Sequence, residues 1–369
     1  MTVGHHAPAS GSKSGVADYA DALDRALRQL GDVRRDAESA DVHLYQLGNN
    51  RLHEAIYAKA LREPGVIVLH DAVLNHFLLG TLSREQYVAE WVYNYGEWRR
   101  QLGEELFDER ARSGVDPRYF EAAMLRRVVE RARAVIVHNP GAAAIARAHG
   151  AQDVHVIPHF FEAREGAADA DGAESRRFRE SIGVGQATRL FGIFGYLREP
   201  KRVMTAIAAF RRLHRQRPDT ALLLAGEPVS GDLRRLLDRE DFTGTGIIRC
   251  GHQDENSFRI VLGSVDCGIN LRYPGAGETS GITIRLMGIG TPVIVTDCPE
   301  NSDYPLQAAL RVRSGVAEAE ELFDHIVLVT EFPEIARKVG EEGRRHIAAY
   351  HSLESVARKY WDVLCHAAS

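Results

Sequence analysis

Short apolar runs alternate with amphipathic stretches along most of the chain. In the first half, apolar runs of strand length occupy residues 42–47, 66–69, 134–137 and 154–157, and Thr2 to His6 is a further short strand candidate. Between them, apolar residues recur at helical spacing, as in Val16, Tyr19, Leu23 and Leu27. Continuous apolar strands that alternate with helices are typical of a parallel sheet covered on both faces.

The second half repeats this pattern, with apolar runs at residues 190–194, 221–225, 246–250, 265–271 and 292–296. A polar stretch at 162–188 predicts a linker that ends in one short helix. We therefore expect an α/β protein with two Rossmann-like, doubly wound domains, at residues 1–161 and 162–348. A final helix at 349–369 is expected to pack back toward the first domain.

Two parts of the first domain depart from the simple alternation. Residues 83–133 predict a helical insertion with several aromatic residues, among them Trp91 and Trp98. Helix packing is the favoured interpretation of these aromatic residues, and an acceptor pocket is the alternative. The segment 31–41 is short and polar, so the first domain is expected to lack a strand or a segment there.

Composition excludes several classes of function. The chain has 369 residues and a net charge of −5, so no overall basic field indicates a nucleic-acid partner. Its four cysteines lie far apart and form no CxxC pair, which fits reduced thiols in a cytoplasmic protein. No apolar run approaches the roughly 18 residues of a transmembrane segment, and no secretory signal is predicted. Peripheral membrane association stays open.

A metal or a cofactor is not expected. Asp169 and Asp171 form a D-x-D pattern, which in other proteins binds metal ions. The pattern lies in a polar linker rather than at the end of a strand, so chance is the favoured explanation.

Candidate chemistry lies where strands end, because ligands in parallel sheets bind at the carboxyl ends of the strands. The glycine-rich turn at 8–15 leads into a helix at Gly15 and can approach a ligand closely. It lacks the order of a phosphate-binding P-loop, and a plain strand-to-helix turn is the alternative. His70 directly follows the strand at 66–69, so we favour a site role over a structural one. Asp71 is expected to cap the next helix.

The second domain carries two candidate anion sites. Arg198, Lys201 and Arg202 follow the strand at 190–194, where cations are well placed to meet a diphosphate. Taken alone, this turn favours the alternative of a solvated basic turn. The stretch 275–281 is a glycine-bearing loop that enters a helix, whose first amides can bind an anion. Glu278 in that loop cannot bind phosphate but can accept hydrogen bonds from hydroxyl groups. The combination suggests a sugar diphosphate.

The residues in these positions resemble the GT-B glycosyltransferases, and in particular retaining glycosyltransferase family 4, also called glycosyl transferases group 1. Residues 194–201 are similar to that family's G-R-L-x-x-x-K segment, and residues 278–293 to its E-G-F-G to G-x-P-V segment. Residues 14–19 look like its glycine loop, and residues 69–71 like the strand end that carries its active-site histidine. The similarity covers nearly the whole chain.

The resemblance implies two domains that face each other across a cleft, where a nucleotide-diphosphate sugar lies. His70, Lys201 and Glu278 would be the catalytic residues. Lys201 would neutralise the leaving diphosphate, Glu278 would hold sugar hydroxyls, and His70 would contact the sugar. Neither a metal ion nor a protein nucleophile is implied.

Substrate-binding residues are also implied by the resemblance. Backbone amides near Gly281 and Ile282 would bind the distal phosphate, and Gly15 would approach the ligand from the first domain. Thr279 and Ser280, beside Glu278, complete the binding loop. Arg198 would replace the family's arginine, since Tyr196 stands in the usual position of that residue.

The expected function is therefore that of a retaining, metal-independent, hexosyltransferase-like glycosyltransferase. Its partners would be a nucleotide-diphosphate sugar and an unknown acceptor, which could be a saccharide, a lipid-linked molecule or a small molecule. Arg285 or Leu286 stands where the family has a second glutamate for the ribose, so the nucleotide is not specified. A non-catalytic subunit that binds a sugar nucleotide or a partner is the alternative, and a phosphorylase on the same fold is a third hypothesis.

Overall fold

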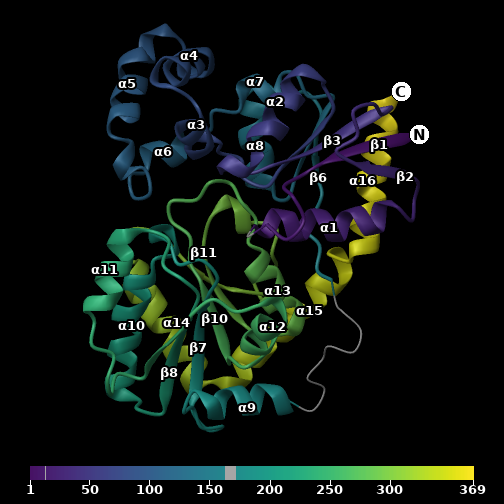
Figure 1. Cartoon of the computed structure of the whole chain (residues 1–369). Helices are drawn as coiled ribbons and strands as arrows, with labels where there is room; N and C mark the ends of the chain where they lie inside the picture. The colour runs from purple at the N-terminus through teal and green to yellow at the C-terminus, as the bar shows by residue number, and fades with distance from the viewer. Residues whose placement is uncertain (13, 163–171) are drawn as a thin grey trace. The chain divides into compact units, whose positions relative to one another are not determined.

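The chain folds into two compact units. The computed structural model describes residues 1–12, 14–162 and 172–369. Unit 1 comprises Met1–Phe160, Pro274–Thr279 and His351–Ser369, and unit 2 comprises Phe161–Tyr273 and Ser280–Tyr350. Each unit contains one six-stranded parallel sheet with helices on both faces, so the predicted α/β class with two doubly wound domains is confirmed (Figure 1).

The sheet of unit 1 has the strand order β2-β1-β3-β4-β5-β6. Its strands are β1 (Thr2–His6), β2 (Asp32–Arg35), β3 (Val42–Leu47), β4 (Val66–Leu69), β5 (Ala134–Val137) and β6 (Val154–Val156). Every neighbouring pair is parallel. The carboxyl ends of the strands therefore lie along one edge of the sheet.

Helices cover both faces of this sheet. The helices of unit 1 are α1 (Gly15–Leu27), α2 (Glu54–Arg62), α3 (Asn75–Thr81), α4 (Arg84–Tyr95), α5 (Arg100–Asp108), α6 (Arg118–Glu121), α7 (Arg126–Val129), α8 (Pro140–Ala148) and α16 (Leu353–Ala368). In β4, Val66 and Val68 pack into the core beneath α1 and α16. Ile67 and Leu69 pack into the opposite core, with α2 and α8. Alternation along buried strands thus gives each face its own apolar core.

The last helix of the chain belongs to unit 1. In Figure 1, α16 runs beside α1, and the two helices share one apolar core. The hydroxyl groups of Tyr19 and Tyr360 lie 3.0 Å apart within that core. Trp361 covers Gly31 so closely that a Cβ on Gly31 would stand 2.2 Å from the indole ring.

The prediction that no strand forms at residues 31–41 is wrong. Strand β2 pairs with β1 at the edge of the sheet, and only Val33 among its four residues is buried. An edge strand with one core-facing residue contains too few apolar residues to be predicted from the sequence pattern. Its Asp32 and Arg34 face solvent, where they form an ion pair at 2.6 Å.

The helical insertion contributes to the core of unit 1 through part of its aromatic residues. Trp91 is buried with Tyr87 and Phe107, as helix packing requires. Trp98 is 78% exposed, and the guanidinium of Arg99 lies 4.6 Å from its ring centre. The predicted aromatic stripe therefore consists of a buried part and an exposed part.

The sheet of unit 2 has the strand order β12-β11-β10-β7-β8-β9. Its strands are β7 (Arg189–Phe194), β8 (Thr220–Ala225), β9 (Ile247–Cys250), β10 (Cys267–Asn270), β11 (Val293–Thr296) and β12 (Leu310–Val312). Its helices are α9 (Ala173–Ser181), α10 (Val203–Gln216), α11 (Gly231–Arg239), α12 (Glu255–Gly263), α13 (Gly281–Ile289), α14 (Glu318–Glu331) and α15 (Pro333–Tyr350). Strand β12 was not predicted from the sequence.

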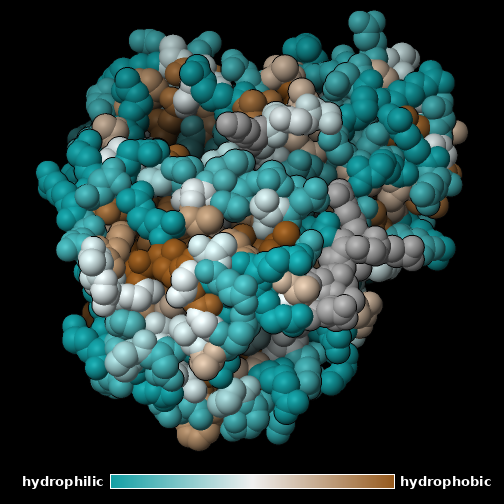
Figure 2. Space-filling model, turned by 60° about the horizontal axis from the view of Figure 1, so that its bottom comes forward, coloured by the Kyte–Doolittle hydropathy of each residue, from teal (hydrophilic) through white to brown (hydrophobic). Residues whose placement is uncertain are grey.

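Exposed apolar side chains are scattered over both units. On the face that Figure 2 shows, hydrophilic residues predominate and hydrophobic residues form smaller groups between them. None of the helices in the described part of the chain is long and apolar enough to cross a membrane.

Candidate functional site

The carboxyl edge of the sheet in unit 1 carries a row of polar side chains. His5 lies in β1, Gln46 lies in β3, and His70 and His138 directly follow β4 and β5. Each occupies an alternate position in line with the apolar residues beneath α1 and α16, such as Leu44 in β3. The face that is apolar in the middle of the sheet is therefore polar at this edge.

His70 is held by neighbours from three elements. Its Nε2 lies 2.7 Å from Oε1 of Gln46. The ring of Tyr19 packs edge-on against it with centroids 4.9 Å apart, and the ring of His138 lies at 5.0 Å. Burial and the surrounding imidazoles lower the pKa of His70 well below its ordinary value, so the ring is neutral at physiological pH.

His138 presents a second neutral imidazole at the same edge. Its Nδ1 donates to the carbonyl oxygen of Ile157 at 2.9 Å. Burial lowers the pKa of His138 to about 4. Its Nε2 is buried and has no hydrogen-bond partner among the described residues. Neutral His138 therefore offers a lone pair that a hydroxyl donor could use.

The loop that carries Glu278, Pro274–Thr279, is part of unit 1 and packs against other residues of that unit. Asn139 donates from Nδ2 to the carbonyl oxygen of Gly277 and to Oγ1 of Thr279, both at 3.0 Å. Gly277 has a φ of 75° and approaches Ala72 so closely that a Cβ would stand 2.5 Å from the Cβ of Ala72. The loop therefore rests on residues that follow β4 and β5, the same strands that end at His70 and His138.

Glu278 is positioned by its own loop. Its Oε2 accepts a hydrogen bond from the amide of Ala276 at 2.7 Å. The side chain is half-buried, while the methyl group of Ala276 lies in the core of unit 1. A carboxylate fixed in this way can still accept hydrogen bonds from ligand hydroxyl groups, because each of its oxygens has two lone pairs.

In unit 2, Lys201 is buried beside the end of β7. It closes a 3₁₀ turn, Glu199–Lys201, and its Nζ donates to the carbonyl oxygen of Phe194. Gly195, with a φ of 73°, makes room for it. A Cβ on Gly195 would stand 3.3 Å from Nζ of Lys201 and 2.9 Å from Cδ1 of Ile282. Lys201 and the first turn of α13 therefore converge on Gly195.

The start of α13 is built by polar residues. Ser280 caps the helix by accepting from the amide of Thr283, and Asn270 donates to Oγ of Ser280 at 2.8 Å. Arg272 points toward the same cap, with Nη2 at 3.5 Å from that oxygen. Because the cap serves Thr283, the amides of Gly281 and Ile282 are the donors that the helix start offers an anion.

No protein-family model and no curated protein sequence matches the chain. Solved structures do match. Sucrose-phosphate synthase from Thermosynechococcus elongatus superposes with a TM-score of 0.68 and 15% identity, over 99% of each chain. Anabaena Alr3699/HepE in complex with UDP-glucose gives a TM-score of 0.64 at 13% identity, over 99% of this chain and 100% of that one. WaaG, a glycosyltransferase involved in lipopolysaccharide biosynthesis, gives a TM-score of 0.64 at 14% identity, over 98% of this chain and 99% of that one.

The chain has the GT-B fold. At these identities the likeness concerns the fold, and the role of each side chain has to be argued from its own surroundings.

The GT-B fold distributes the predicted residues over the two units. Unit 1 holds Gly15, His70, Glu278 and Thr279, and unit 2 holds Arg198, Lys201, Ser280, Gly281 and Ile282. Gly15 begins α1 behind Ser14, which caps the helix by accepting at Oγ from the amide of Val16 at 3.3 Å. Arg198 is exposed. The predicted cap at Asp71 is wrong, because Asp71 accepts from the amide of Asn49 at 2.8 Å and α3 begins four residues later.

Sequence reasoning missed four polar residues that build these edges. Gln46 was visible as an amide side chain in an apolar strand, and His138-Asn139 follow β5 as His70-Asp71 follow β4. Arg272 follows β10 in the same way. Arg285, by contrast, forms an ion pair with Glu255 of α12 at 3.1 Å. Its guanidinium therefore binds α12 rather than the start of α13.

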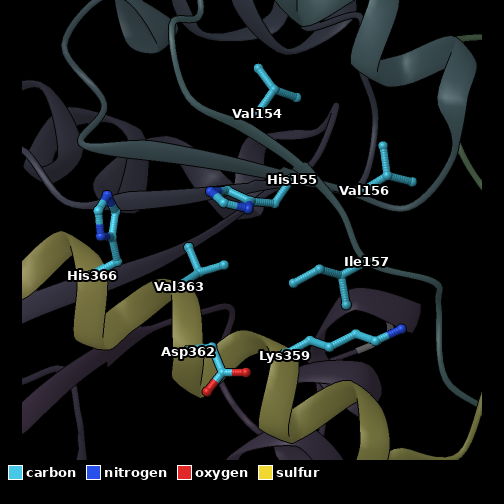
Figure 3. Close-up of a pocket in the computed structure, with 8 residues that line it drawn as sticks. All are labelled: Val154, His155, Val156, Ile157, Lys359, Asp362, Val363 and His366. Carbon is cyan, nitrogen blue, oxygen red and sulfur yellow. The ribbon is translucent and has the colours of Figure 1, made fainter.

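Two other features do not belong to the candidate site. Asp169 and Asp171 lie outside the described residues, and among the described ones no group of three His, Cys, Asp or Glu side chains could hold a metal ion. An open hollow lies between β6 and α16, where His155 and Lys359 face it with Val363 (Figure 3). It contains none of the predicted site residues.

Proposed function

We propose that the chain is a retaining, metal-independent glycosyltransferase that moves a sugar from a nucleotide-diphosphate sugar to an acceptor hydroxyl. The observation that carries the proposal is the convergence of Lys201 and the first turn of α13 on Gly195. A buried cation and a side chain of the first helical turn both lie beside Gly195, and a cation together with a helix start would suit a ligand with two negatively charged phosphates.

The diphosphate half of the site supplies electrostatic stabilisation. As the bond between the sugar C1 and the phosphate oxygen breaks, negative charge grows on the leaving diphosphate. Lys201, Arg272 and the amides of Gly281 and Ile282 are placed to meet that charge. Preorganised donors of this kind are usually the largest catalytic contribution. Lys201 donates to the carbonyl oxygen of Phe194, which directs its ammonium group to the end of β7.

The transfer step needs no protein nucleophile. The acceptor hydroxyl approaches C1 from the face that the diphosphate leaves, and its proton passes to the departing phosphate oxygen. The new bond joins C1 to the acceptor oxygen on the same face, so the configuration at C1 is retained. Atoms and charges balance within donor and acceptor, and the protein provides position and charge.

The sugar half of the site would be formed by Glu278, Thr279 and His70. Glu278 lies three residues before Gly281, so the loop that presents its carboxylate continues directly into the anion-binding turn. Its carboxylate can accept from sugar hydroxyls, and the neutral His70 can do the same. Gly15 begins the helix whose Tyr19 packs on His70.

UDP is the first nucleotide to test, because the HepE structures contain UDP and UDP-glucose. Arg198 is exposed near the turn that carries Lys201 and would add charge to the diphosphate side. Arg285 would not contact the ribose, because Glu255 holds its guanidinium.

A thermal-shift screen against nucleoside diphosphates and nucleotide sugars, in buffer with EDTA, tests the proposal. A ligand at 100-fold its dissociation constant stabilises the folded protein by about 2.7 kcal/mol. We expect a nucleotide sugar to raise the unfolding temperature without divalent cations. Stabilisation only in the presence of Mg²⁺ would contradict metal independence. If no nucleotide sugar changed the unfolding temperature, the proposed donor class would be wrong.

The screen is followed by a turnover assay, which separates the enzyme from a non-catalytic sugar-nucleotide-binding subunit. Release of nucleoside diphosphate from the bound donor supports the enzyme. Phosphate-dependent release of sugar 1-phosphate would indicate a phosphorylase instead.

A further inference from the structure

A chain of hydrogen bonds crosses the carboxyl edge of the sheet in unit 1 and ends at His70. Asp24, in α1, lies 3.0 Å from Nδ1 of His5. Nε2 of His5 lies 3.0 Å from Nε2 of Gln46, and Oε1 of Gln46 lies 2.7 Å from Nε2 of His70. His5 and Gln46 are fully buried, and both are strand residues. Four residues from α1, β1, β3 and the end of β4 thus form one connected path.

The chemistry of Asp24 determines the direction of every bond along this path. An ionised carboxylate can only accept, so His5 donates from Nδ1. The neutral ring then has a lone pair on Nε2, which accepts from the amide nitrogen of Gln46. The amide oxygen of Gln46 in turn accepts from Nε2–H of His70. His70 therefore carries its proton on Nε2 and has a lone pair on Nδ1.

Both ends of the path keep the charge states that this direction requires. Burial tends to raise the pKa of Asp24, but the hydrogen bond from His5 and nearby cations outweigh it, and the pKa is lowered. Arg28 is one of these cations, with Nη2 at 2.9 Å from the carboxylate. Burial lowers the pKa values of His5 and His70. Asp24 is therefore ionised and both rings are neutral near pH 7.

We propose that Asp24, His5 and Gln46 are positioning residues that hold His70 in the Nε2–H tautomer and present Nδ1 as a hydrogen-bond acceptor. The proposal deepens the proposed function and rests on it for the ligand: Nδ1 would select a hydroxyl group that donates, as a sugar hydroxyl can. A group that can only accept, such as a carbonyl oxygen, would be rejected at this point.

The location of the path supports a positioning role rather than a purely structural one. The middle of this face is occupied by apolar residues such as Leu44, Val66 and Val68. A stable core alone does not require two imidazoles, an amide and a carboxylate in series, because replacing paired buried polar groups by apolar ones is often neutral. Tyr19 closes one side of His70 and allows the ring little rotation.

Substitution of Asp24 by asparagine should reverse the path. Arg28 can only donate, so it attracts the amide oxygen of the new side chain and turns the amide nitrogen toward His5. His5 then accepts at Nδ1 and donates from Nε2, Gln46 turns over, and His70 receives a hydrogen bond at Nε2. The proton of His70 moves to Nδ1. Asp36→Asn is the matched control, because Asp36 is an exposed carboxylate at the same edge, 3.6 Å from His6.

Nitrogen NMR of the full-length protein, labelled with ¹⁵N-histidine, reads the tautomers directly, and His70→Gln identifies the signals of His70. We expect Nε2–H in the unmodified protein and in D36N, Nδ1–H in D24N, and loss of the single tautomer in Gln46→Leu. A proton on Nδ1 of His70 in the unmodified protein overturns the proposal even if no variant folds. An unchanged Nε2–H signal in folded D24N also overturns it.

A binding experiment ties the path to the ligand. With UDP-glucose and UDP as probes, D24N should weaken the nucleotide sugar by about two- to tenfold, as the loss of one hydrogen bond does, and leave UDP unchanged. Equal weakening of both probes would contradict the assignment. If neither probe binds the unmodified protein while the tautomers are as expected, the proposed nucleotide-sugar donor is wrong. The assignment of Asp24, His5 and Gln46 as positioning residues is then still supported by the tautomers.

Discussion

The ammonium group of Lys201 lies 3.3 Å from the point where a side chain on Gly195 would begin. Cδ1 of Ile282, in the first turn of α13, lies 2.9 Å from the same point. Gly195 is therefore a place where the end of β7, the buried cation and a side chain of α13 come together, and a side chain there would have to displace one of them.

Gly195→Ala should abolish detectable diphosphate binding and lower stability. The φ of 73° costs a non-glycine residue about 1–2 kcal/mol, and the added methyl group displaces Lys201 or Ile282. Gly183→Ala is the matched control, because its φ is 74° but nothing lies within 4 Å of the added Cβ. Calorimetric titration with UDP should show binding to G183A and none to G195A. Equal affinities would show that the convergence on Gly195 does not serve the ligand.

Lys201→Met should cut turnover by about 10² to 10³, the usual cost of losing one preorganised donor to a developing anion. Methionine fills the same space without charge, which limits the effect on folding. Lys338→Ala, on the exposed face of α15, serves as the control and should leave turnover unchanged. Steady-state kinetics with a saturating donor measure the turnover of both variants. A loss of less than about threefold in K201M would count against the role of Lys201.

Asn139→Asp should loosen the loop at 274–279. The carboxylate can still accept from the amide of Ala142 at the start of α8, but it can no longer donate to Gly277 and Thr279. Hydrogen exchange followed by mass spectrometry should show faster exchange in the loop and no change in α8. Because the loop presents Glu278, sugar-nucleotide binding should weaken while UDP binding persists. Unchanged protection of the loop would mean that other contacts hold it.

Acid should destabilise the protein through His138. The unfolded ring has a pKa near 6.5 and the folded ring one of about 4, so the unfolded state binds more protons between these values. The contribution to stability is complete above pH 6.5 and is lost as the pH falls toward 4. At pH 5 the loss is about 2 kcal/mol. Urea unfolding of His138→Asn at pH 7.5 and 5.0 should show a pH dependence smaller by that amount, whereas exposed His252→Asn should behave as the unmodified protein does.

Much of the architecture follows from local sequence. Segments of strand length, most of them apolar, predict ten of the strands within a residue or two, because short apolar runs between helices fit a parallel sheet. Strand ends then identify His70 and the turn with Lys201, since ligands meet parallel sheets at that edge. The strands that escaped, β2 and β12, are edge strands of four and three residues.

Long-range polar contacts were beyond the reach of local patterns. The hydrogen bond from Asn139 to Gly277 joins residues 138 positions apart, and it places Glu278 in unit 1 although the flanking sequence belongs to unit 2. Asp24 is an ordinary charged residue in an amphipathic helix until His5 is seen beside it. Gln46 was the one visible sign, since a buried strand amide must find partners.

The central claim is that a sugar leaves its nucleotide and keeps its configuration without the help of a metal ion. The most direct measurement is proton NMR of the anomeric signals during turnover with the donor found by thermal shift, in the presence of EDTA. The account predicts release of nucleoside diphosphate and a product whose anomeric configuration equals that of the donor, with both lost in K201M. A product of opposite configuration, or bound donor that is never turned over with any acceptor, would contradict it.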